Sequence, residues 1–399
     1  MNRVPTPPAW AAKLFTVGVT GTNGKTTTTA WVAAALRTLS TPVARATTVG
    51  FFLDDVPLEI EKSYDGFLKG MRACVDRGGT HAATELTSEA LARGFARAWP
   101  CRVGVFTNLT HDHLDAHGSP EHYLASKAQL FVSLPPGGTA VLNASDENYP
   151  LLKEVTPQGV LHRSYAVPSR GAVQGEPDIV ATSIAIDWAG TRIACKVKDP
   201  SLPAELRVRA IGAVYAENAL AALLGAVAAG ADPRAAADAI AAAPAPPGRF
   251  EVIHERPWVV VDYAHSPDAL ARTVAIAREL AGRSRLFVVF GAGGKRDKDK
   301  RGPMGEAARP ADVVLLTTDN PRDEDPSAIC RAIAEGLTGH AGVRTELDRA
   351  KAIAAAIREA SPDDVVLIAG KGHETEMTVG AEVRHFSDVE AARTALSAR

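Results

Sequence analysis

The stretch Gly21-Thr22-Asn23-Gly24-Lys25-Thr26 lies between an apolar, strand-like run, Leu14–Thr20, and a helix-like run, Thr27–Leu39. A glycine-rich turn at the start of a helix directs backbone N–H groups toward an anion, and the helix dipole adds to the attraction. Lys25 can reach terminal phosphates, and the Thr26 hydroxyl can join the shell of a bound Mg²⁺. The loop is a short GxxGKT form of the usual pattern. The flanking strand and helix favour a phosphate-binding loop over a plain turn, so we expect a nucleotide triphosphate as ligand.

Composition fits a soluble intracellular enzyme of two or three domains. The chain has 399 residues, of which 46% are hydrophobic and 23% charged, enough to bury large cores. The net charge of -2 gives no electrostatic reason to expect nucleic acid or an anionic membrane as the main partner. The four cysteines form no CxxC pair and indicate ordinary reduced thiols. No signal-type core or membrane-spanning run is present, so a cytoplasmic location is expected.

The first section of the chain, to about residue 143, alternates strand and helix patterns. The expected strands are Leu14–Thr20, Thr80–Glu85, Val103–Asn108 and Thr139–Leu142, and the expected helices are Thr26–Leu39, Asp65–Asp76, Ser88–Ala98 and Pro120–Leu134. This alternation predicts a parallel sheet covered by helices on both faces. Ligands of such sheets bind at the carboxyl ends of the strands. Glu85 and Asn108 should lie at that edge, beside the phosphate loop.

The rest of the chain predicts a strand-rich segment, a linker and a second α/β domain. Residues 149–209 have short strands and turns, with an expected hairpin of Ile179–Trp188 and Thr191–Val197. The Ala-rich runs Ala216–Ala229 and Pro233–Ala242 predict helices, and the proline-rich Ala243–Gly248 predicts a linker. The pattern then restarts, with expected strands at Val259–Asp262, Leu286–Phe290, Val313–Thr317 and Val365–Ala369.

A set of motifs follows in order along nearly the whole chain. They are Gly21–Thr28, Thr107–His117, Tyr123–Lys127, Asn218–Ala222, Pro247–Glu251, Asp262–Asp268, Asp319–Arg322 and Gly370–Glu374. Together they resemble the motifs of the Mur ligases, the ATP-dependent enzymes that build the peptidoglycan peptide, and are most similar to the MurE-type branch, the UDP-N-acetylmuramoyl-tripeptide synthetases. The resemblance implies a central P-loop ATPase domain with a parallel sheet over residues 1–247. It also implies a C-terminal, Rossmann-like, amino-acid-binding domain over residues 248–399.

The resemblance implies that ATP and Mg²⁺ drive the reaction. In this family the γ-phosphoryl group of ATP passes to a carboxylate of the acceptor, and an amino group attacks the acyl phosphate to form an amide. The residues implied to bind ATP are Gly21, Thr22, Asn23, Gly24, Lys25, Thr26, Thr27, Asn218, Arg249, Asp262 and His265. The implied catalytic residues are Lys25, Glu85, His113 and Lys127, and the implied metal ligands are Thr26, Glu85, His113 and Lys127. Phosphoryl transfer needs positioning and charge neutralisation above all.

Two of these assignments compete with simpler interpretations. In the family, the lysine at the position of Lys127 is carbamoylated by CO₂ and then supports a metal, whereas periodicity alone favours an ordinary helix-surface lysine. Only a neutral amine reacts with CO₂, so nearby cations would have to lower its pKa. The histidines between His111 and His122 could instead form a zinc site. The neighbouring acidic residues and the strand-end location favour phosphate and Mg²⁺ chemistry, and only His113 receives a role.

The motif Asp319-Asn320-Pro321-Arg322 is the main signal for the amino acid that is added. In the branch that adds meso-diaminopimelate, Asn320 and Arg322 would grip its distal groups, because a guanidinium binds a carboxylate through two parallel hydrogen bonds. Glu374, with Gly370 in the same motif, would receive the distal ammonium; the alternative is a simple proline-containing turn. The basic run Lys295–Arg301 is either a solvated charge run or an anion-binding loop, and the family usually has Asp or Asn at Lys295.

The chain departs from the family in the features that hold the acceptor. Only twenty residues precede Gly21, where the family has a UDP-binding domain, so we expect that domain to be absent. Glu61–Asp65 replaces a Thr-Thr-Pro element, and Thr87–Glu89 replaces Ser-Ser-His. In the adenine-side helix motif of the family, Tyr215 replaces one Asn, although Asn218 remains. The expected partners are therefore a small acidic acceptor and an amino-acid donor. Ligation to a folate or to a polyglutamate or cyanophycin chain stays open, as does a non-catalytic nucleotide-binding subunit.

Overall fold

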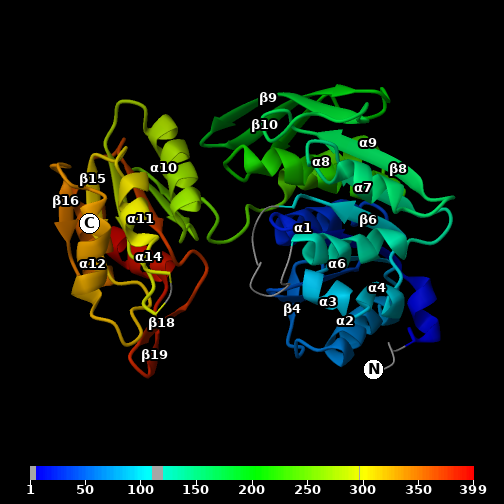
Figure 1. Cartoon of the computed structure of the whole chain (residues 1–399), viewed down its shortest axis with the longest axis horizontal. Coiled ribbons are helices and arrows are strands. Elements are labelled where there is room, and N and C mark those ends of the chain that lie inside the picture. Colours follow the sequence, from blue (N-terminus) through cyan, green and yellow to red (C-terminus); the bar gives the residue numbers. More distant parts are fainter. Residues whose placement is uncertain (1–5, 110–119, 296) are drawn as a thin grey trace. The chain divides into compact units, whose positions relative to one another are not determined.

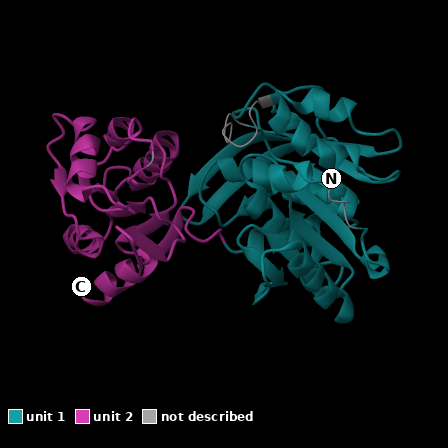
Figure 2. Ribbon diagram, turned by 60° about the horizontal axis from the view of Figure 1, so that its bottom comes forward, with its two compact units in different colours: residues 1–244 teal, residues 245–399 magenta. Residues whose placement is uncertain are grey.

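The computed structural model describes residues 6–109, 120–295 and 297–399 (Figure 1). The chain divides into two compact units, Met1–Pro244 and Ala245–Arg399, coloured separately in Figure 2. Each unit is built around its own sheet. In the described part of the chain, no helix has the length and apolar character needed to cross a membrane.

Unit 1 contains a mixed sheet with the strand order β11-β10-β9-β8-β7-β6-β1-β5-β2-β3-β4. The strands are β1 (Phe15–Thr20), β2 (Val43–Thr47), β3 (Gly50–Leu53), β4 (Val56–Leu58), β5 (His81–Glu85), β6 (Val103–Phe106), β7 (Thr139–Asn143), β8 (Leu161–Ala166), β9 (Ile179–Asp187), β10 (Gly190–Val197) and β11 (Glu205–Val208). From β9 to β2 all neighbours are parallel, and antiparallel strands extend the sheet at both edges. Strand β1 is central, with β5 on one side and β6 on the other.

Helices cover both faces of this sheet. They are η1 (Ala9–Lys13), α1 (Lys25–Leu36), α2 (Tyr64–Asp76), α3 (Ser88–Ala92), α4 (Phe95–Ala98), α6 (Pro120–Val132), α7 (Tyr149–Glu154), α8 (Val214–Ala228) and α9 (Pro233–Ala242). In β6, a Cβ on Gly104 would lie 3.2 Å from Leu130 of α6, whereas Val105 lies next to Gly225 of α8. Successive residues of a strand face opposite sides of the sheet, so α6 and α8 cover opposite faces.

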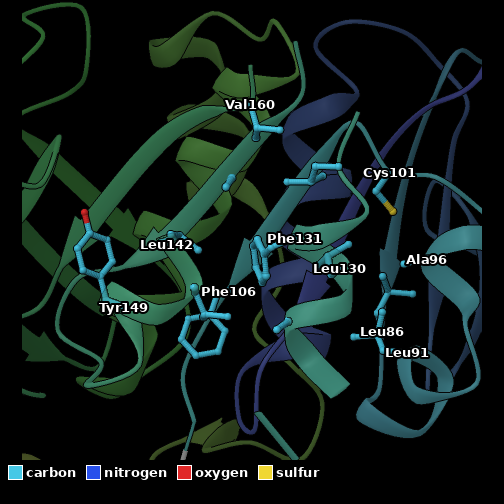
Figure 3. Close-up of a cluster of buried hydrophobic side chains, with 14 of the residues drawn as sticks. Leu86, Leu91, Ala96, Cys101, Phe106, Leu130, Phe131, Leu142, Tyr149 and Val160 are labelled. Carbon is cyan, nitrogen blue, oxygen red and sulfur yellow. The ribbon is translucent and has the colours of Figure 1, made fainter. Parts of the chain in front are cut away.

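A buried apolar cluster fixes helix α6 against the sheet (Figure 3). Phe131 of α6 and Phe106 of β6 are fully buried, and their rings meet edge to face with centroids 6.4 Å apart. Leu130 contributes to the same cluster, next to Leu86 and Cys101. Burying a side chain of this size contributes about 2 kcal/mol. The cluster therefore sets the position of α6, which carries Tyr123 and Lys127 toward the carboxyl end of β1.

Unit 2 contains a sheet with the order β12-β13-β17-β14-β15-β16, in which only β12 is antiparallel to its neighbour. The strands are β12 (Glu251–Glu255), β13 (Trp258–Asp262), β14 (Leu286–Phe290), β15 (Val313–Leu316), β16 (Val343–Thr345) and β17 (Val365–Ala369), with a separate hairpin of β18 (Glu376–Val379) and β19 (Glu382–His385). The helices are α10 (Pro267–Ala281), α11 (Arg301–Ala307), α12 (Pro326–Glu335), α13 (Arg349–Glu359) and α14 (Asp388–Ser397). Strands β14 and β17 are buried throughout, as expected for parallel strands covered on both faces.

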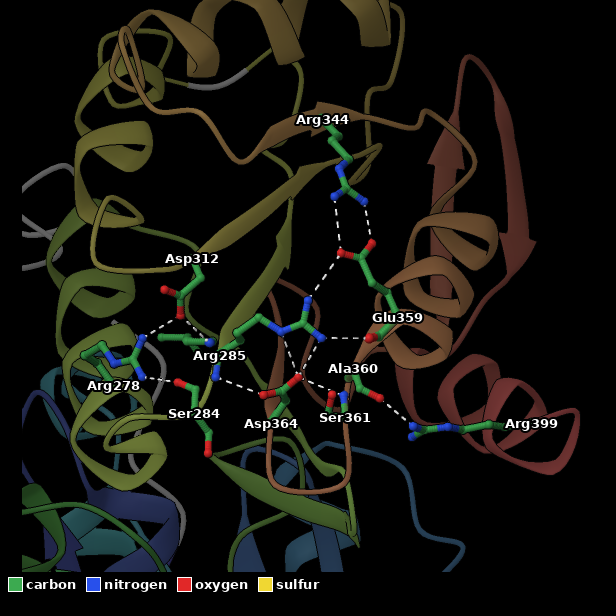
Figure 4. A network of polar contacts seen from close by, with 11 residues as sticks. Arg278, Ser284, Arg285, Asp312, Arg344, Glu359, Ala360, Ser361, Asp364 and Arg399 are labelled. Carbon is green, nitrogen blue, oxygen red and sulfur yellow. Dashed lines mark hydrogen bonds and ion pairs between the residues drawn. The ribbon is translucent and has the colours of Figure 1, made fainter.

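An ionic network lies at the amino ends of the strands of unit 2 (Figure 4). Asp364, just before β17, accepts hydrogen bonds from the backbone N–H of Arg285 at 2.9 Å and of Ser361 at 2.7 Å. The guanidinium of Arg285 also contacts Asp364, at 2.9 Å. Asp312, just before β15, accepts from the Leu286 N–H at 2.7 Å. These carboxylates join the starts of three strands, at the edge opposite the loops described below.

The α/β class with two parallel-rich sheets, predicted from the sequence, is confirmed. The main difference lies in the helix expected over Ser88–Ala98. It is two short helices, because Gly94 between them adopts a left-handed φ of 86° and breaks the hydrogen-bond ladder. The strand-rich segment after residue 149 also differs, since β8 to β11 continue the sheet of unit 1.

Candidate active site

The phosphate loop of unit 1 joins the end of β1 to the start of α1. Gly24, the residue before the helix, has a left-handed φ of 82°. Gly24 has no side chain with which to cap this helix, whereas Ser63 and Thr87 cap α2 and α3. Uncapped N–H groups at a helix start are suited to bind an anion. Lys25 folds back over the loop, with its Nζ 2.7 Å from the carbonyl oxygen of Thr22.

The segment after β6 holds the phosphate loop in place. Asn108 accepts a hydrogen bond from the Thr22 N–H on its backbone oxygen, at 2.7 Å, and from the Asn23 N–H on its side chain, at 3.0 Å. The Thr107 hydroxyl donates to the Asn23 oxygen at 2.7 Å. A Cβ on Gly21 would lie 1.9 Å from that hydroxyl oxygen, so only glycine fits. The sequence placed Asn108 at this edge of the sheet, and the structure gives it the task of bracing the loop.

Glu85, at the end of β5, lies next to the first turn of α1. The Thr26 hydroxyl donates to Glu85 Oε2 at 2.9 Å. Thr48, which follows β2, holds the same carboxylate through its N–H at 3.1 Å and its hydroxyl at 3.2 Å. A carboxylate beside a threonine hydroxyl is an oxygen donor set of the kind that Mg²⁺ prefers. These residues fit the metal that the sequence implies.

Lys127 of α6 is buried beneath the phosphate loop, and the residue is only 1% exposed. Its Nζ donates to the carbonyl oxygen of Gly21 at 2.7 Å and lies 4.3 Å from the ring centroid of Tyr123. Burial and the charge of Lys25 lower the pKa of Lys127 to about 7, against the opposing effect of Glu85. A large fraction of this amine is therefore neutral near neutral pH, and the interpretation as a helix-surface lysine is wrong.

Asn218 of α8 also lies against the phosphate loop, next to Gly24. It is 2% exposed, and its Oδ1 has no hydrogen-bond partner among the described residues. A Cβ on Gly24 would lie 2.1 Å from this oxygen. Glycine at position 24 thus serves both the loop conformation and the room for Asn218. The buried, unpaired amide oxygen is a site for a donor group from a ligand.

In unit 2, a second group of polar side chains follows β13. Asp262 accepts from the N–H groups of Phe250 and Ala264, at 2.7 and 2.8 Å, and so supports the two loops on either side. The guanidinium of Arg249 lies 4.6 Å from the ring centroid of Tyr263. The ring of His265 meets the same tyrosine edge to face at 4.7 Å. Arg249 and His265, both predicted to bind nucleotide, are therefore arranged around Tyr263.

The predicted amino-acid-binding residues follow β15 and β17. The side-chain amide of Asn320 donates to Glu374 Oε2 at 3.2 Å, and its Oδ1 accepts a hydrogen bond from the Thr378 N–H at 2.9 Å. Arg322 Nη1 donates to the carbonyl oxygen of Gly294 at 2.7 Å. Asn320 and Arg322 have left-handed φ values of 45° and 52°, which cost strain for non-glycine residues. The strained turn brings an amide, a guanidinium and a carboxylate to one edge of the sheet.

Charged groups beneath this turn are buried. Lys371 is fully buried and donates to Glu374 Oε2 at 3.2 Å. Asp319 is 6% exposed, and burial raises its pKa despite the nearby Arg349 and Lys371. A Cβ on Gly370 would lie 2.5 Å from the Asp319 carboxylate, so the two predicted motifs pack directly against each other. Sequence reasoning quoted Lys371 without giving it a role.

The basic run after β14 is paired with acidic residues of the neighbouring turn. Lys295 forms an ion pair with Asp323, and Arg301 contacts Glu324 at 2.9 Å. Lys300 donates to the carbonyl oxygen of His265 at 2.8 Å. Lys295 and Arg301 tie the run to the turn that carries Arg322, and Lys300 ties it to the loop after β13. Arg301 is buried, whereas Lys295 stays 60% exposed, so both interpretations of the run remain open.

His113 and the rest of segment 110–119 lie outside the described residues. Within the described ranges, no cluster of three or more His, Cys, Asp or Glu side chains could hold a metal ion. The structure otherwise groups the predicted residues in two places, at the phosphate loop of unit 1 and at the strand ends of unit 2. Sequence reasoning missed Thr48 because β2 was not expected, and missed Tyr263 although its motif was quoted.

The phosphate loop and the parallel sheet define unit 1 as a P-loop nucleotide-binding domain. Residues 19–226 match the Mur ligase middle domain, and residues 248–372 match the Mur ligase glutamate ligase domain. The chain therefore belongs to the Mur ligase family and is an ATP-dependent, ADP-forming ligase, as the sequence motifs predicted.

Relatives and a solved structure support the family assignment along the whole chain. The chain is 40% identical to the UDP-N-acetylmuramoyl-L-alanyl-D-glutamate–2,6-diaminopimelate ligase of Synechococcus elongatus, over 98% of this chain and 78% of that protein. It is 36% identical to the ligase of the same name from Geobacillus kaustophilus, over 97% of this chain and 80% of that protein. A solved structure of a ligase with this name superposes with a TM-score of 0.74 at 31% identity, covering 96% of this chain and 78% of the other.

Proposed function

We propose that this ligase joins a diamino dicarboxylic acid, such as meso-diaminopimelate, to a peptidoglycan-related acidic acceptor in the cytoplasm. The observation that carries the proposal is the turn after β15, in which Asn320 contacts Glu374 while Arg322 is held by Gly294. A guanidinium and a carboxylate on adjoining loops match the distal carboxylate and ammonium of such an amino acid. Relatives that carry 2,6-diaminopimelate in their names support the same donor.

In this proposal, residues 1–247 bind ATP and residues 248–399 bind the amino acid. Lys25 and the N–H groups of the phosphate loop would neutralise the triphosphate, and Asn218 would receive a donor group of the nucleotide. Arg249, Asp262 and His265 would contribute from the second domain, Asp262 by holding the loops beside it. The acceptor carboxylate would take the γ-phosphoryl group, and the donor amine would displace phosphate from the acyl phosphate.

Thr26 and Glu85 would hold Mg²⁺, whose charge would stabilise the transferring phosphoryl group. His113 stays a predicted ligand. Lys127 is proposed to be carbamoylated. The support for this is its lowered pKa, since a neutral amine is the form that reacts with CO₂. The carbamate would turn a buried cation into an anion beneath the phosphate loop.

The test is ADP release with purified protein and defined substrates. Diaminopimelate should exceed L-lysine in kcat/KM by about 100-fold, because lysine leaves the guanidinium of Arg322 unpaired. Lys25→Ala and Glu85→Ala should lower kcat at least about 100-fold, since each removes charge that acts in the transition state. Lys196→Ala, on an exposed strand position, is the matched control for the loss of a lysine. Equal use of lysine and diaminopimelate would reject the proposed donor.

A second candidate is ligation to a different acidic acceptor, such as a polyglutamate-like or cyanophycin-like chain. It is favoured by the altered acceptor elements. Ser63 and Thr87, which stand within these elements, cap α2 and α3 through hydrogen bonds to the N–H groups of Gly66 and Ala90. Comparing a muramoyl dipeptide with and without its UDP group, with one donor, separates the candidates. A large preference for the UDP form would assign the chain the ordinary tripeptide-synthetase role.

A further inference from the structure

Tyr263 lies between two groups of residues that the proposed function uses for different ligands. Its ring contacts Arg249 and His265, on the nucleotide side. Its hydroxyl donates to Glu374 Oε1 at 3.3 Å, on the amino-acid side. From these contacts we infer that Tyr263 is a positioning residue that couples nucleotide binding to amino-acid binding within unit 2. The inference rests on the proposed function and extends it to a residue that has no role there.

The backbone and Cβ of Tyr263 are held in place by close packing of the neighbouring loops. A Cβ on Gly372 would lie 2.7 Å from the Cβ of Tyr263, and a Cβ on Gly248 would lie 2.2 Å from the backbone N of His373. Three loops, after residue 247, after β13 and after β17, therefore pack with no room for a side chain between them. The ring of His373 lies 5.4 Å from that of Tyr263. The position from which the Tyr263 ring extends is therefore fixed by all three loops.

The hydroxyl of Tyr263 holds one oxygen of the Glu374 carboxylate, and other residues hold the second oxygen. Glu374 Oε2 receives Asn320 and Lys371, at 3.2 Å each, so its charge is balanced on that side. Oε1 receives the tyrosine hydroxyl, and the Glu374 side chain is 35% exposed. A donor amino acid that meets this carboxylate therefore meets an oxygen whose direction Tyr263 sets. Conversely, a ligand that draws Glu374 outward pulls on the hydroxyl and turns the ring under Arg249.

Two substitutions test the ring and the hydroxyl of Tyr263 separately. Tyr263→Phe keeps the ring contacts and removes the hydrogen bond to Glu374. It should weaken binding of meso-diaminopimelate about tenfold and leave the affinity for Mg²⁺–β,γ-methylene-ATP unchanged. Tyr263→Leu also removes the cation–π contact with Arg249 and should weaken binding of the nucleotide analogue several-fold. Calorimetry with the full chain measures each dissociation constant alone and in the presence of the other ligand.

The coupling factor is the dissociation constant of one ligand measured alone, divided by its dissociation constant in the presence of the other ligand. In the wild type, the analogue should tighten diaminopimelate binding, and the factor should fall toward one in Tyr263→Phe. If Tyr263 had a purely structural role, Tyr263→Phe would lower thermal stability and weaken binding of both ligands alike. The coupling factor would then stay unchanged. That result would overturn the inference, as would a Phe variant that matches the wild type in both affinities and in the factor.

A double-mutant cycle decides the role of Tyr263 without any amino acid. Glu374→Gln replaces the carboxylate that accepts the hydrogen bond from the Tyr263 hydroxyl. The change that this substitution causes in affinity for the ATP analogue should pass through Tyr263. It should therefore be lost when Glu374→Gln is combined with Tyr263→Phe. Additive effects would overturn the inference. If the wild type binds the analogue but not diaminopimelate, the proposed donor fails, while this cycle still decides the coupling.

Discussion

At the scale of single residues, burial and neighbouring charges change what a side chain can do. Lys127 shows this most clearly, because a helix lysine in this sequence pattern gives no sign of how deeply it is buried. Its amine is enclosed by the Gly21 carbonyl and the Tyr123 ring, and its pKa falls to about 7. Glu85 is a second case, since its direction depends on Thr48, a residue that directly follows a strand that the sequence did not reveal.

The lowered pKa of Lys127 predicts how stability depends on pH. The unfolded lysine has a pKa of about 10.4, so between about pH 7 and 10.4 the unfolded chain binds more protons than the folded one. The folded state is penalised fully below pH 7, and the penalty disappears as pH rises toward 10.4. Lys127→Met should therefore be more stable than the wild type at pH 6, by several kcal/mol, and the gain should shrink by up to about 1.4 kcal/mol per pH unit.

Urea unfolding followed by the fluorescence of the buried Trp31 and Trp99 measures this difference in free energy of unfolding. Buffers depleted of CO₂ keep the amine unmodified, and added bicarbonate tests the carbamate: it should stabilise the wild type but not Lys127→Met. A stability difference that stays constant from pH 6 to 9 would mean that Lys127 keeps its ordinary pKa in the folded protein.

At the scale of elements, the sequence predicted most of the parallel strands and the loops that follow them. Apolar runs such as Leu286–Phe290 and Val365–Ala369 were found with the correct bounds, because buried parallel strands are continuously apolar. Strands β2 to β4, which form one edge of the sheet of unit 1, were missed, since their mixed residues pair only through contacts made in the folded sheet. The site was predictable where a motif follows a strand, as at Glu85, and unpredictable where side chains meet across loops, as at Tyr263.

The start of helix α1 offers a matched test of the phosphate loop. Gly24 and Gly78 have nearly equal left-handed φ values, 82° and 83°. A Cβ on Gly78 meets nothing within 4 Å, whereas a Cβ on Gly24 would clash with Asn218. Both Gly→Ala changes should cost at least about 1 kcal/mol of stability from backbone strain. Only Gly24→Ala should also weaken binding of an ATP analogue, by at least about tenfold, as measured by calorimetry.

An equal loss of affinity in both variants would show that the effect comes from general destabilisation. In that case the contact between Gly24 and Asn218 would not be part of the nucleotide site.

At the scale of the whole molecule, the chain consists of two units with separate cores, and unit 2 divides its tasks between the two edges of one sheet. The ionic network around Asp364 lies at the amino ends of the strands, and the proposed ligand-binding loops lie at the carboxyl ends. Catalytic and stabilising residues are often separated in this way in α/β folds.

This separation predicts that Asp364→Asn lowers stability without changing ligand affinity. Burial raises the pKa of Asp364, but hydrogen bonds from Ser361 and Arg285 outweigh it and lower the pKa overall. The carboxylate therefore stabilises the fold above about pH 4, and this contribution is lost as pH falls through its folded pKa. The expected loss at pH 7 is about 2 kcal/mol, shrinking in acid, measured by urea unfolding. The KM for the amino donor should not change.

Asp363→Asn is the control for this prediction. Asp363 is the adjacent residue, and its ion pair with Arg256 is exposed, so its removal should change stability by less than about 1 kcal/mol. A similar loss in both variants would mean that position and burial within the network do not matter.

The two-edged sheet of unit 2 also bears on how the family can acquire new substrates. The loops after β15 and β17 can vary in sequence while the charges that join the strand starts remain, so a change of amino donor need not begin with a loss of folded protein. A library confined to Asn320, Arg322 and Glu374, which leaves the buried Asp319 and Lys371 and the close-packed Gly372 unchanged, should therefore yield mostly folded chains. Among these, variants that join other amino acids can be selected by growth or by product mass, and unit 2 becomes a starting scaffold for new peptide-bond-forming enzymes.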